Sequence, residues 1–137
     1  MHKKIRIELS STLDVINHVY ITGGYGMQQV NQRRLLSALC HGAIFFSSTI
    51  VSIGVPIAIM LTTNDPVVKE NAKESLNFHI NLYIYAIVFA LLILVAIGIP
   101  LLAVLAIVSF IMPVLAILHV LDDPNSPYRY PFIFRVV

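Results

Sequence analysis

Charged residues are scarce in this sequence. They make up 12% of its 137 residues, whereas 58% of the residues are hydrophobic, and an average soluble domain carries about 25% charged residues. None of residues 75–121 is Asp, Glu, Lys or Arg, and the same holds for residues 35–64. The missing charge indicates segments that do not meet water. We therefore predict an all-α integral membrane protein that is embedded in the lipid bilayer.

Several other features are also missing, and each absence narrows the function. The chain has one cysteine, Cys40, which excludes an internal disulfide. Its net charge of +2 is too small to indicate nucleic-acid binding. No Gly-Lys-Ser or Gly-Lys-Thr follows the glycines at 23–26, so they do not form a phosphate-binding loop. No Ser/His/Asp or Cys/His set has an orienting group, and we predict that the protein is not an enzyme.

The apolar runs predict three transmembrane helices, at about 35–61, 77–97 and 101–121. A single helix over residues 75–121 would reach about 70 Å, against a hydrocarbon core of about 30 Å. Gly98-Ile99-Pro100 near its middle is the punctuation available for the bend of a helical hairpin, and Pro113 is expected to kink the third span. Pro56 should kink the first span or end its regular part early. Three spans would place the two ends of the membrane domain on opposite sides.

The segments outside the spans are polar or interfacial in composition. Residues 1–32 form a polar N-terminal extension, in which alternating Ile5, Ile7 and Leu9 suggest a short strand and Gly23-Gly24-Tyr25-Gly26 a flexible connector. Asp65 should cap a helix that starts at Pro66. We expect residues 66–75 to form an interfacial amphipathic helix between the first and second spans. The C-terminal tail interleaves aromatic residues with arginines, which is typical of the membrane interface.

Polar residues in the apolar segments form two stripes at helical spacing. The first contains Ser37, His41, Ser48 and Ser52, which lie within about 60° on a helical wheel. The second contains Glu70, Glu74, Asn77, Asn81 and Tyr85. The stripes could face each other, with Asn side chains bonding to Ser and His at roughly 0.6–2 kcal/mol per bond. They would then hold the helices together, contact a translocating or partner segment, or reach lipid headgroups.

Three histidines, His41, His79 and His119, lie near the ends of the predicted spans. Their spacing and neighbours match no metal-site pattern. Capping or inter-helix hydrogen bonds are the ordinary roles of such residues, and axial ligation of a pigment magnesium is the alternative. We therefore predict no metal and no cofactor.

Three blocks of residues resemble a known family. They are Leu36-Ser37-Ala38-Leu39-Cys40-His41, the run from Asp65 to His79 that ends in Lys73-Glu74-Ser75-Leu76-Asn77-Phe78-His79, and Tyr128-Arg129-Tyr130-Pro131 with Arg135. Over about residues 33–135 the chain resembles the Tic-twenty-like family, small bacterial membrane proteins grouped with the twenty-kilodalton subunit of the chloroplast inner-envelope translocon. The resemblance implies family-motif positions at Lys73, His79, Tyr128, Arg129, Tyr130 and Arg135. Most bacterial members of that family have no established function, and the chloroplast relative is implicated in protein import.

Two hypotheses follow for the function. The first is a non-catalytic, translocon-like component that acts in a larger complex in protein transport, insertion or assembly. Because three helices cannot enclose an aqueous pore alone, it would need other membrane-protein subunits or a homo-oligomer. The alternative is an accessory subunit or assembly factor of an energy-transducing membrane complex, such as a photosynthetic one. The expected location is the bacterial inner membrane or the thylakoid.

Overall fold

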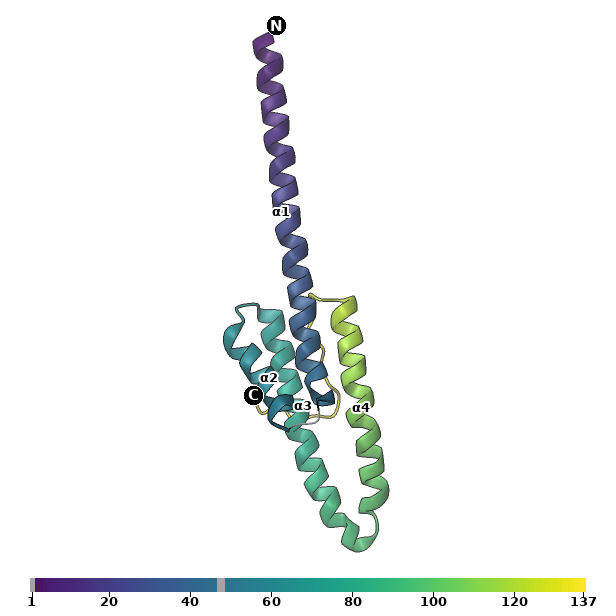
Figure 1. The fold of residues 1–137 in the computed structure, drawn as a ribbon. Coiled ribbons are helices and arrows are strands. Elements are labelled where there is room, and N and C mark those ends of the chain that lie inside the picture. The colour runs from purple at the N-terminus through teal and green to yellow at the C-terminus, as the bar shows by residue number, and fades with distance from the viewer. Residues whose placement is uncertain (1, 47–48) are drawn as a thin grey trace. The chain divides into compact units, whose positions relative to one another are not determined.

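The protein is all-helical in the residues described. The computed structural model describes the backbone of residues 2–46 and 49–137, and the side chains of residues 11–46 and 50–137. Helices account for 83% of the chain, and the described residues contain no strand. The elements are α1 (His2–Gly42), η1 (Ala43–Phe45), α2 (Thr49–Thr62), α3 (Pro66–Leu91), η2 (Leu92–Val95) and α4 (Gly98–Asp122) (Figure 1).

The chain divides into two compact units, residues 1–32 and 33–137. In the first unit, residues 2–32 belong to helix α1, so the predicted strand at Ile5–Leu9 and the predicted break at Gly23–Gly26 are wrong. An alternation of five residues is a weak strand signal. The glycines have no positive φ, and isolated glycines are tolerated in a helix at about 1 kcal/mol each.

The predicted first span, residues 35–61, is not one helix. Helix α1 ends at Gly42, η1 follows, and Phe46 has an extended ψ of 120° that interrupts the helical hydrogen bonds. Helix α2 has 14 residues and contains Pro56 in its interior, so at 1.5 Å per residue it reaches only about 21 Å, short of the bilayer core. The helical run is therefore interrupted before α2 begins, and Pro56 does not cause the interruption because it lies inside α2.

Helix α3 begins as predicted. The Asp65 carboxylate accepts hydrogen bonds from the backbone N–H of Val67 at 2.9 Å and of Val68 at 3.2 Å, and Pro66 occupies the first turn. The helix then runs without interruption to Leu91. The expected interfacial helix at 66–75 is thus the first part of α3 and not a separate element, because no residue between them breaks the helix.

The hairpin bend lies just before the predicted Gly98-Ile99-Pro100. Ala96 has a left-handed φ of 62°, and α4 already begins at Gly98. A Cβ atom at Gly98 would collide with the Phe89 carbonyl oxygen and the Ile93 nitrogen, so glycine permits the close approach of the two helices. Pro100 lies in the first turn of α4, where its missing N–H costs little. The expected third span, 101–121, lies within α4, which continues past Pro113.

Two helical segments are long and apolar enough to cross a membrane. They are Pro66–Val95, with 30 residues, and Gly98–Asp122, with 25 residues. Little of either is covered by the protein itself, since only 17% and 11% of their most apolar windows are buried. Leu94, Val104 and Ile107 are more than half exposed. An exposed apolar surface of this extent fits a lipid environment, so we find two such helices among the described residues instead of the predicted three.

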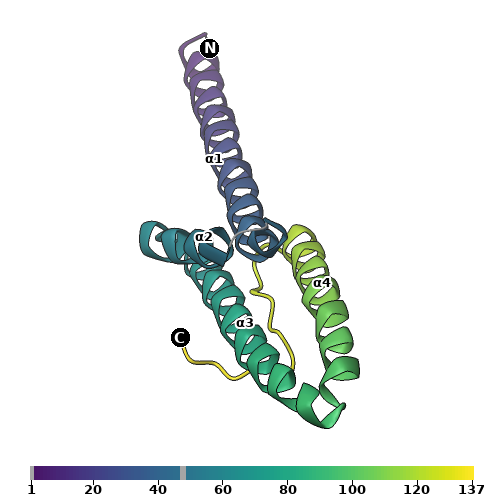
Figure 2. The same cartoon turned by 60° about the horizontal axis from the view of Figure 1, so that its bottom comes forward.

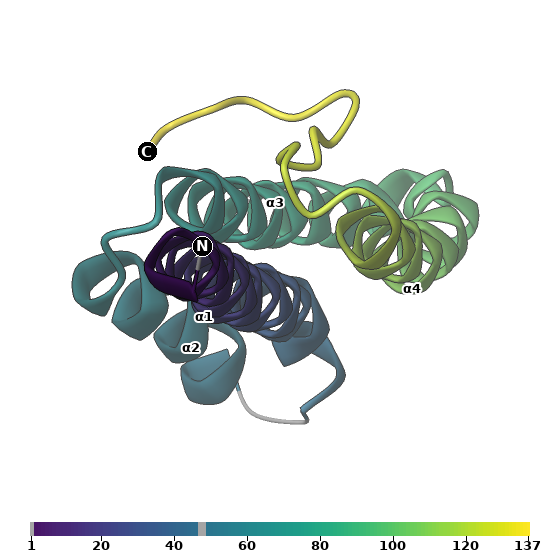
Figure 3. The same cartoon turned by 90° about the horizontal axis from the view of Figure 1, so that it is seen from above.

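The C-terminal tail, residues 123–137, has no regular secondary structure and runs along α3 (Figures 2 and 3). Tyr130 is 2% exposed and stacks on Phe78 with ring centroids 4.2 Å apart. These two residues and Ala116 of α4 form a small core, against which Tyr128 and Ile133 pack. The tail thus completes the core, while Phe132 and Phe134 remain exposed.

Candidate functional site

One face of α3 carries a row of buried polar side chains. Asn71, Glu74, Asn77 and Asn81 are each 1% exposed, and their spacing of three, three and four residues places them on one side of the helix. Every one of them bonds to the backbone of the C-terminal tail. We call these four residues and tail residues 128–137 the tail clasp.

Glu74 is the charged centre of the tail clasp. Its carboxylate accepts hydrogen bonds from Arg129 Nη1 at 2.7 Å, from Arg135 Nε at 2.5 Å and from the backbone N–H of Tyr130 at 3.3 Å. The arginine side chains are 54% and 44% exposed, so only the carboxylate is fully removed from solvent. A buried carboxylate is tolerated when such charge-assisted bonds satisfy its oxygens. Glu74 therefore ties the tail to α3.

Asn77 and Asn81 hold the tail through its main chain. Asn81 accepts from the N–H of Phe134 at 2.9 Å and donates to its carbonyl at 2.7 Å. Asn77 Oδ1 accepts from the N–H groups of Val136 at 2.8 Å and Val137 at 2.9 Å. Their partners thus differ from the predicted Ser and His side chains of the other stripe, since the extended tail presents its backbone to this face of α3.

His41 and Ser37 bond to α3 at Asn71, a residue that the predicted stripe did not include. Asn71 Oδ1 accepts from the N–H of Tyr128 at 2.9 Å, and His41 Nε2 lies 3.0 Å from the same oxygen. Because an amide oxygen can only accept, His41 Nε2 carries a proton. His41 Nδ1 then accepts from the Tyr130 hydroxyl at 2.9 Å, and burial raises the pKa of Tyr130 above its ordinary value. Asn71 Nδ2 donates to Ser37 Oγ at 3.2 Å. Both ring nitrogens of His41 are therefore used within the protein.

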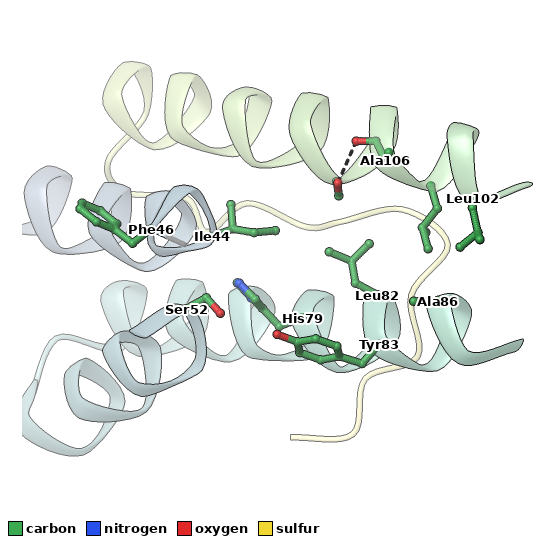
Figure 4. Close-up of a pocket in the computed structure, with 11 residues that line it drawn as sticks. Ile44, Phe46, Ser52, His79, Leu82, Tyr83, Ala86, Leu102 and Ala106 are labelled. Atoms are coloured by element: carbon green, nitrogen blue, oxygen red, sulfur yellow. Dashed lines mark hydrogen bonds between the residues drawn. The ribbon is translucent and has the colours of Figure 1, made fainter. Parts of the chain in front are cut away.

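The remaining predicted residues have separate positions. Lys73 is half-exposed and lies 3.5 Å from Glu70, and the Tyr85 hydroxyl donates to the Phe132 carbonyl at 3.2 Å. Ser48 lies outside the described residues. His119 packs against Tyr128 with ring centroids 5.5 Å apart. Ser52 and His79 line a cavity on a different side of α3 (Figure 4).

A second polar cluster, not predicted from the sequence, joins three segments at one end of the membrane domain. Arg33 Nε donates to Asp65 at 2.6 Å and Arg33 Nη1 to Asn125 at 2.5 Å. Residue 33 and the start of the tail therefore lie at the same end, contrary to the three-span expectation of opposite sides. The reason is the break after Gly42, which lets the chain return to this end through α2.

Neither the clasp nor the cluster has the composition of a metal site. No group of three or more His, Cys, Asp or Glu residues among those described could hold a metal ion. The only signal that could have revealed Asn71 is its spacing, because it lies three residues before Glu74 and continues the row. The bonds between Arg33, Asp65 and Asn125 connect distant segments, and no sequence pattern marks them.

Comparison with known proteins assigns the family. The model of the magnetosome magnetite crystal formation protein family (MamF/MmsF) matches residues 32–137, and the chain belongs to this family. No curated protein and no solved structure matches it. The Tic-twenty-like assignment is therefore wrong. The blocks on which it rested lie at the end of α1, in the first half of α3 and in the tail, where Ser37, His41, Glu74 and Arg135 make contacts that build this fold.

The family assignment also corrects the expected setting. A magnetosome family does not support a thylakoid location or a role in a translocon. It is compatible with a non-catalytic protein, and together with the exposed apolar helices it indicates an integral membrane protein.

Proposed function

We propose that this chain is a non-catalytic integral protein of the magnetosome membrane that takes part in magnetite crystal formation as a subunit of a larger membrane assembly. The observation that carries the proposal is the apolar α3–α4 hairpin in a chain of this family. Such a hairpin anchors the protein at the membrane that its family name indicates.

The state of the buried polar groups supports a structural role. Glu74 and His41 are candidate acid–base groups by residue type, yet each is bonded to other parts of the fold. General acid or base catalysis needs a group within reach of a substrate proton. These residues instead fix the tail, so the protein would act through its surface and its partners.

Complementation in a magnetite-forming bacterium tests the proposal. The chromosomal copy is deleted in a strain that has no second family member, and wild-type protein with an epitope tag is returned. We expect the deletion to change the size of the crystals measured by electron microscopy, and the returned protein to restore it. Crystals of unchanged size and number after deletion would refute the proposed role.

The same strain tests the membrane assembly. The tagged protein should remain in isolated magnetosome membranes after alkaline carbonate extraction, and chemical crosslinking in these membranes should give products larger than the 15.2 kDa chain. Release by carbonate would contradict the anchored hairpin. A protein that stays in the membrane but forms no crosslinked product would contradict the assembly only.

A further inference from the structure

His79 has one ring nitrogen without a partner. The residue is 2% exposed, and its Nδ1 lies 2.7 Å from the carbonyl oxygen of Ser75. Because a carbonyl only accepts, Nδ1 carries the proton and Nε2 keeps a lone pair. Nε2 has no hydrogen-bond partner among the described residues. A buried acceptor without a hydrogen bond is destabilising, so a ligand that donates a hydrogen bond to His79 Nε2 would be favoured there.

This nitrogen belongs to a residue that lines a cavity of about 460 Å³. Figure 4 shows the His79 ring between Ser52 of α2 and Leu82 of α3. The lining residues come from η1, α3 and α4 as well as α2, and most of them are apolar: Ile44, Leu82, Ala86, Leu102, Leu105 and Ala106. The volume falls within the roughly 300–1,000 Å³ of small-molecule sites.

The walls restrict what can occupy the cavity. Water occupies about 30 Å³ per molecule in the liquid and needs two to four polar partners, so apolar walls do not favour filling this volume with water. A charged ligand would lose its hydration against the same walls. A metal ion lacks a ligand set, since the described residues contain no suitable group. The occupant must be neutral, largely apolar and able to donate one hydrogen bond.

We propose that the cavity beside His79 binds a neutral, lipid-soluble molecule that carries a hydroxyl group, with the hydroxyl donating to His79 Nε2. The molecule would enter from the bilayer, because Phe46 and Tyr83, two of the lining residues, are 61% and 40% exposed. A second cavity of about 370 Å³ lies between the hairpin and the tail. Its polar residues Asn81 and Tyr85 are already bonded to the tail, so it lacks the acceptor that distinguishes the first.

A pair of matched probes tests the hydrogen bond. The full chain, labelled with ¹⁵N at its histidine rings, is placed in phosphatidylcholine nanodiscs, whose lipid has no hydroxyl group. We expect 4-butylphenol to shift the His79 Nε2 resonance saturably to the position of a hydrogen-bonded nitrogen. The methyl ether 4-butylanisole, which cannot donate, should bind about tenfold more weakly, corresponding to roughly 1.4 kcal/mol for the lost bond.

Matched variants separate the cavity from the rest of the helix. Ala86→Leu places extra volume in the cavity and should abolish the shift, whereas Ala90→Leu, one turn further along α3 and not a lining residue, should preserve it. His79→Phe keeps an aromatic ring without the acceptor, and should bind phenol and anisole equally. Unchanged His41 and His119 resonances would show that each variant is folded.

The source of the hydroxyl is distinguished by one further addition. A shift on adding diacylglycerol to the nanodiscs identifies a membrane lipid as the occupant, and a shift with the phenol alone identifies a small lipophile. Equal affinity for phenol and anisole, or no shift with either hydroxyl compound, would overturn the proposal. A shift with Zn²⁺ and none with phenol would replace it with a metal site.

Discussion

In a soluble protein polar side chains are mostly exposed and apolar ones buried, whereas helix α3 buries polar side chains in its first half and exposes apolar ones in its second half. In the first half, from Asn71 to Asn81, amide and carboxylate groups are buried and fully engaged with the tail. In the second half, Ile84, Ile87 and Leu91 are between 48% and 65% exposed. The difference shows that hydrogen bonding holds the first half in place, whereas the second half depends on lipid to cover its apolar surface.

Removal of the Glu74 carboxylate should have the largest effect on this comparison. Glu74→Ala removes the acceptor of the buried Tyr130 amide and the shortest contacts of Arg129 and Arg135; Arg129 keeps only its longer contact with Glu70, at 3.4 Å. The two arginines are about half exposed, so no buried charge is left unpaired, and the cost is that of the lost hydrogen bonds to a charged group, about 1.5–3 kcal/mol for each bond; the melting temperature in mild detergent should fall. Glu70→Ala is the matched control; Glu70 is 39% exposed, and we expect a change below about 1 kcal/mol. Equal effects of both substitutions would contradict the clasp.

A charge on the exposed apolar surface of the hairpin should weaken membrane insertion. Ile107 of α4 is 58% exposed, and Ile107→Lys would place a charge on the lipid face at a cost of about 2.5–3.5 kcal/mol. We expect a larger fraction of the protein to be released by carbonate extraction. Ile107→Leu should be retained like the wild type. Full retention of the lysine variant would mean that this face does not meet lipid.

Substitution of Gly98 tests how closely α3 and α4 approach. Gly98→Ala introduces a Cβ atom against the backbone at Phe89 and Ile93, and overpacking of this kind costs about 1–3 kcal/mol. Gly54→Ala is the control, because nothing lies within 4 Å of a Cβ at that position. We expect a fall in the detergent melting temperature for the first variant only. A neutral Gly98→Ala would indicate that the hairpin bend can open.

The Asn77→Leu, Asn81→Leu double variant separates tail docking from helix packing. It removes the acceptors for the amides of Phe134, Val136 and Val137, at about 1 kcal/mol for each lost bond. Hydrogen exchange should accelerate at these three amides and leave the α2–α3 region unchanged. Faster exchange along α2 would instead support the predicted pairing of the two helical stripes.

The smallest effect concerns the ion pair at the domain end. Burial raises the pKa of Asp65, but the Arg33 hydrogen bond and the two backbone N–H groups outweigh it, and the net pKa lies below the ordinary value of 3.8. The stabilisation is therefore present above pH 3.8 and is lost as the pH falls through the lowered pKa. Arg33→Gln should reduce the acid-induced loss of stability. An unchanged acid transition would mean that this pair contributes nothing.

Local features of the fold were predictable, and contacts over long sequence distances were not. The Asp65 cap and the hairpin bend depend on residues close in sequence, so the first was predicted correctly and the second to within a few residues. The break after Gly42 was missed because residues 35–61 carry no charge, and the strongest helix breaker in the run, Pro56, lies inside α2 and not at the break. Asn77 and Asn81 were recognised as a polar row, but their partner is the tail, about sixty residues away in sequence.

The family was predicted wrongly for a related reason. The Lys73–His79 block resembles the Tic-twenty-like family, whereas the family model that matches the chain is a magnetosome one. In the structure, Glu74 and Asn77 bind the tail and His79 lines the cavity. A block of this kind constrains how a helix packs, and similar packing serves proteins with different roles.

The cluster of Arg33, Asp65 and Asn125 has a consequence for how the protein reaches its membrane. It holds the segment before α3 and the segment after α4 together at one end of the hairpin. Residues 75–121 contain no Asp, Glu, Lys or Arg. Carrying a charged side chain into hydrocarbon costs about 2.5–3.5 kcal/mol. Residues 75–121 of the hairpin contain no such side chain, so their insertion avoids this cost. The hairpin can therefore enter the bilayer as one unit from a single side. The C-terminal tail can then bind to α3 from that same side.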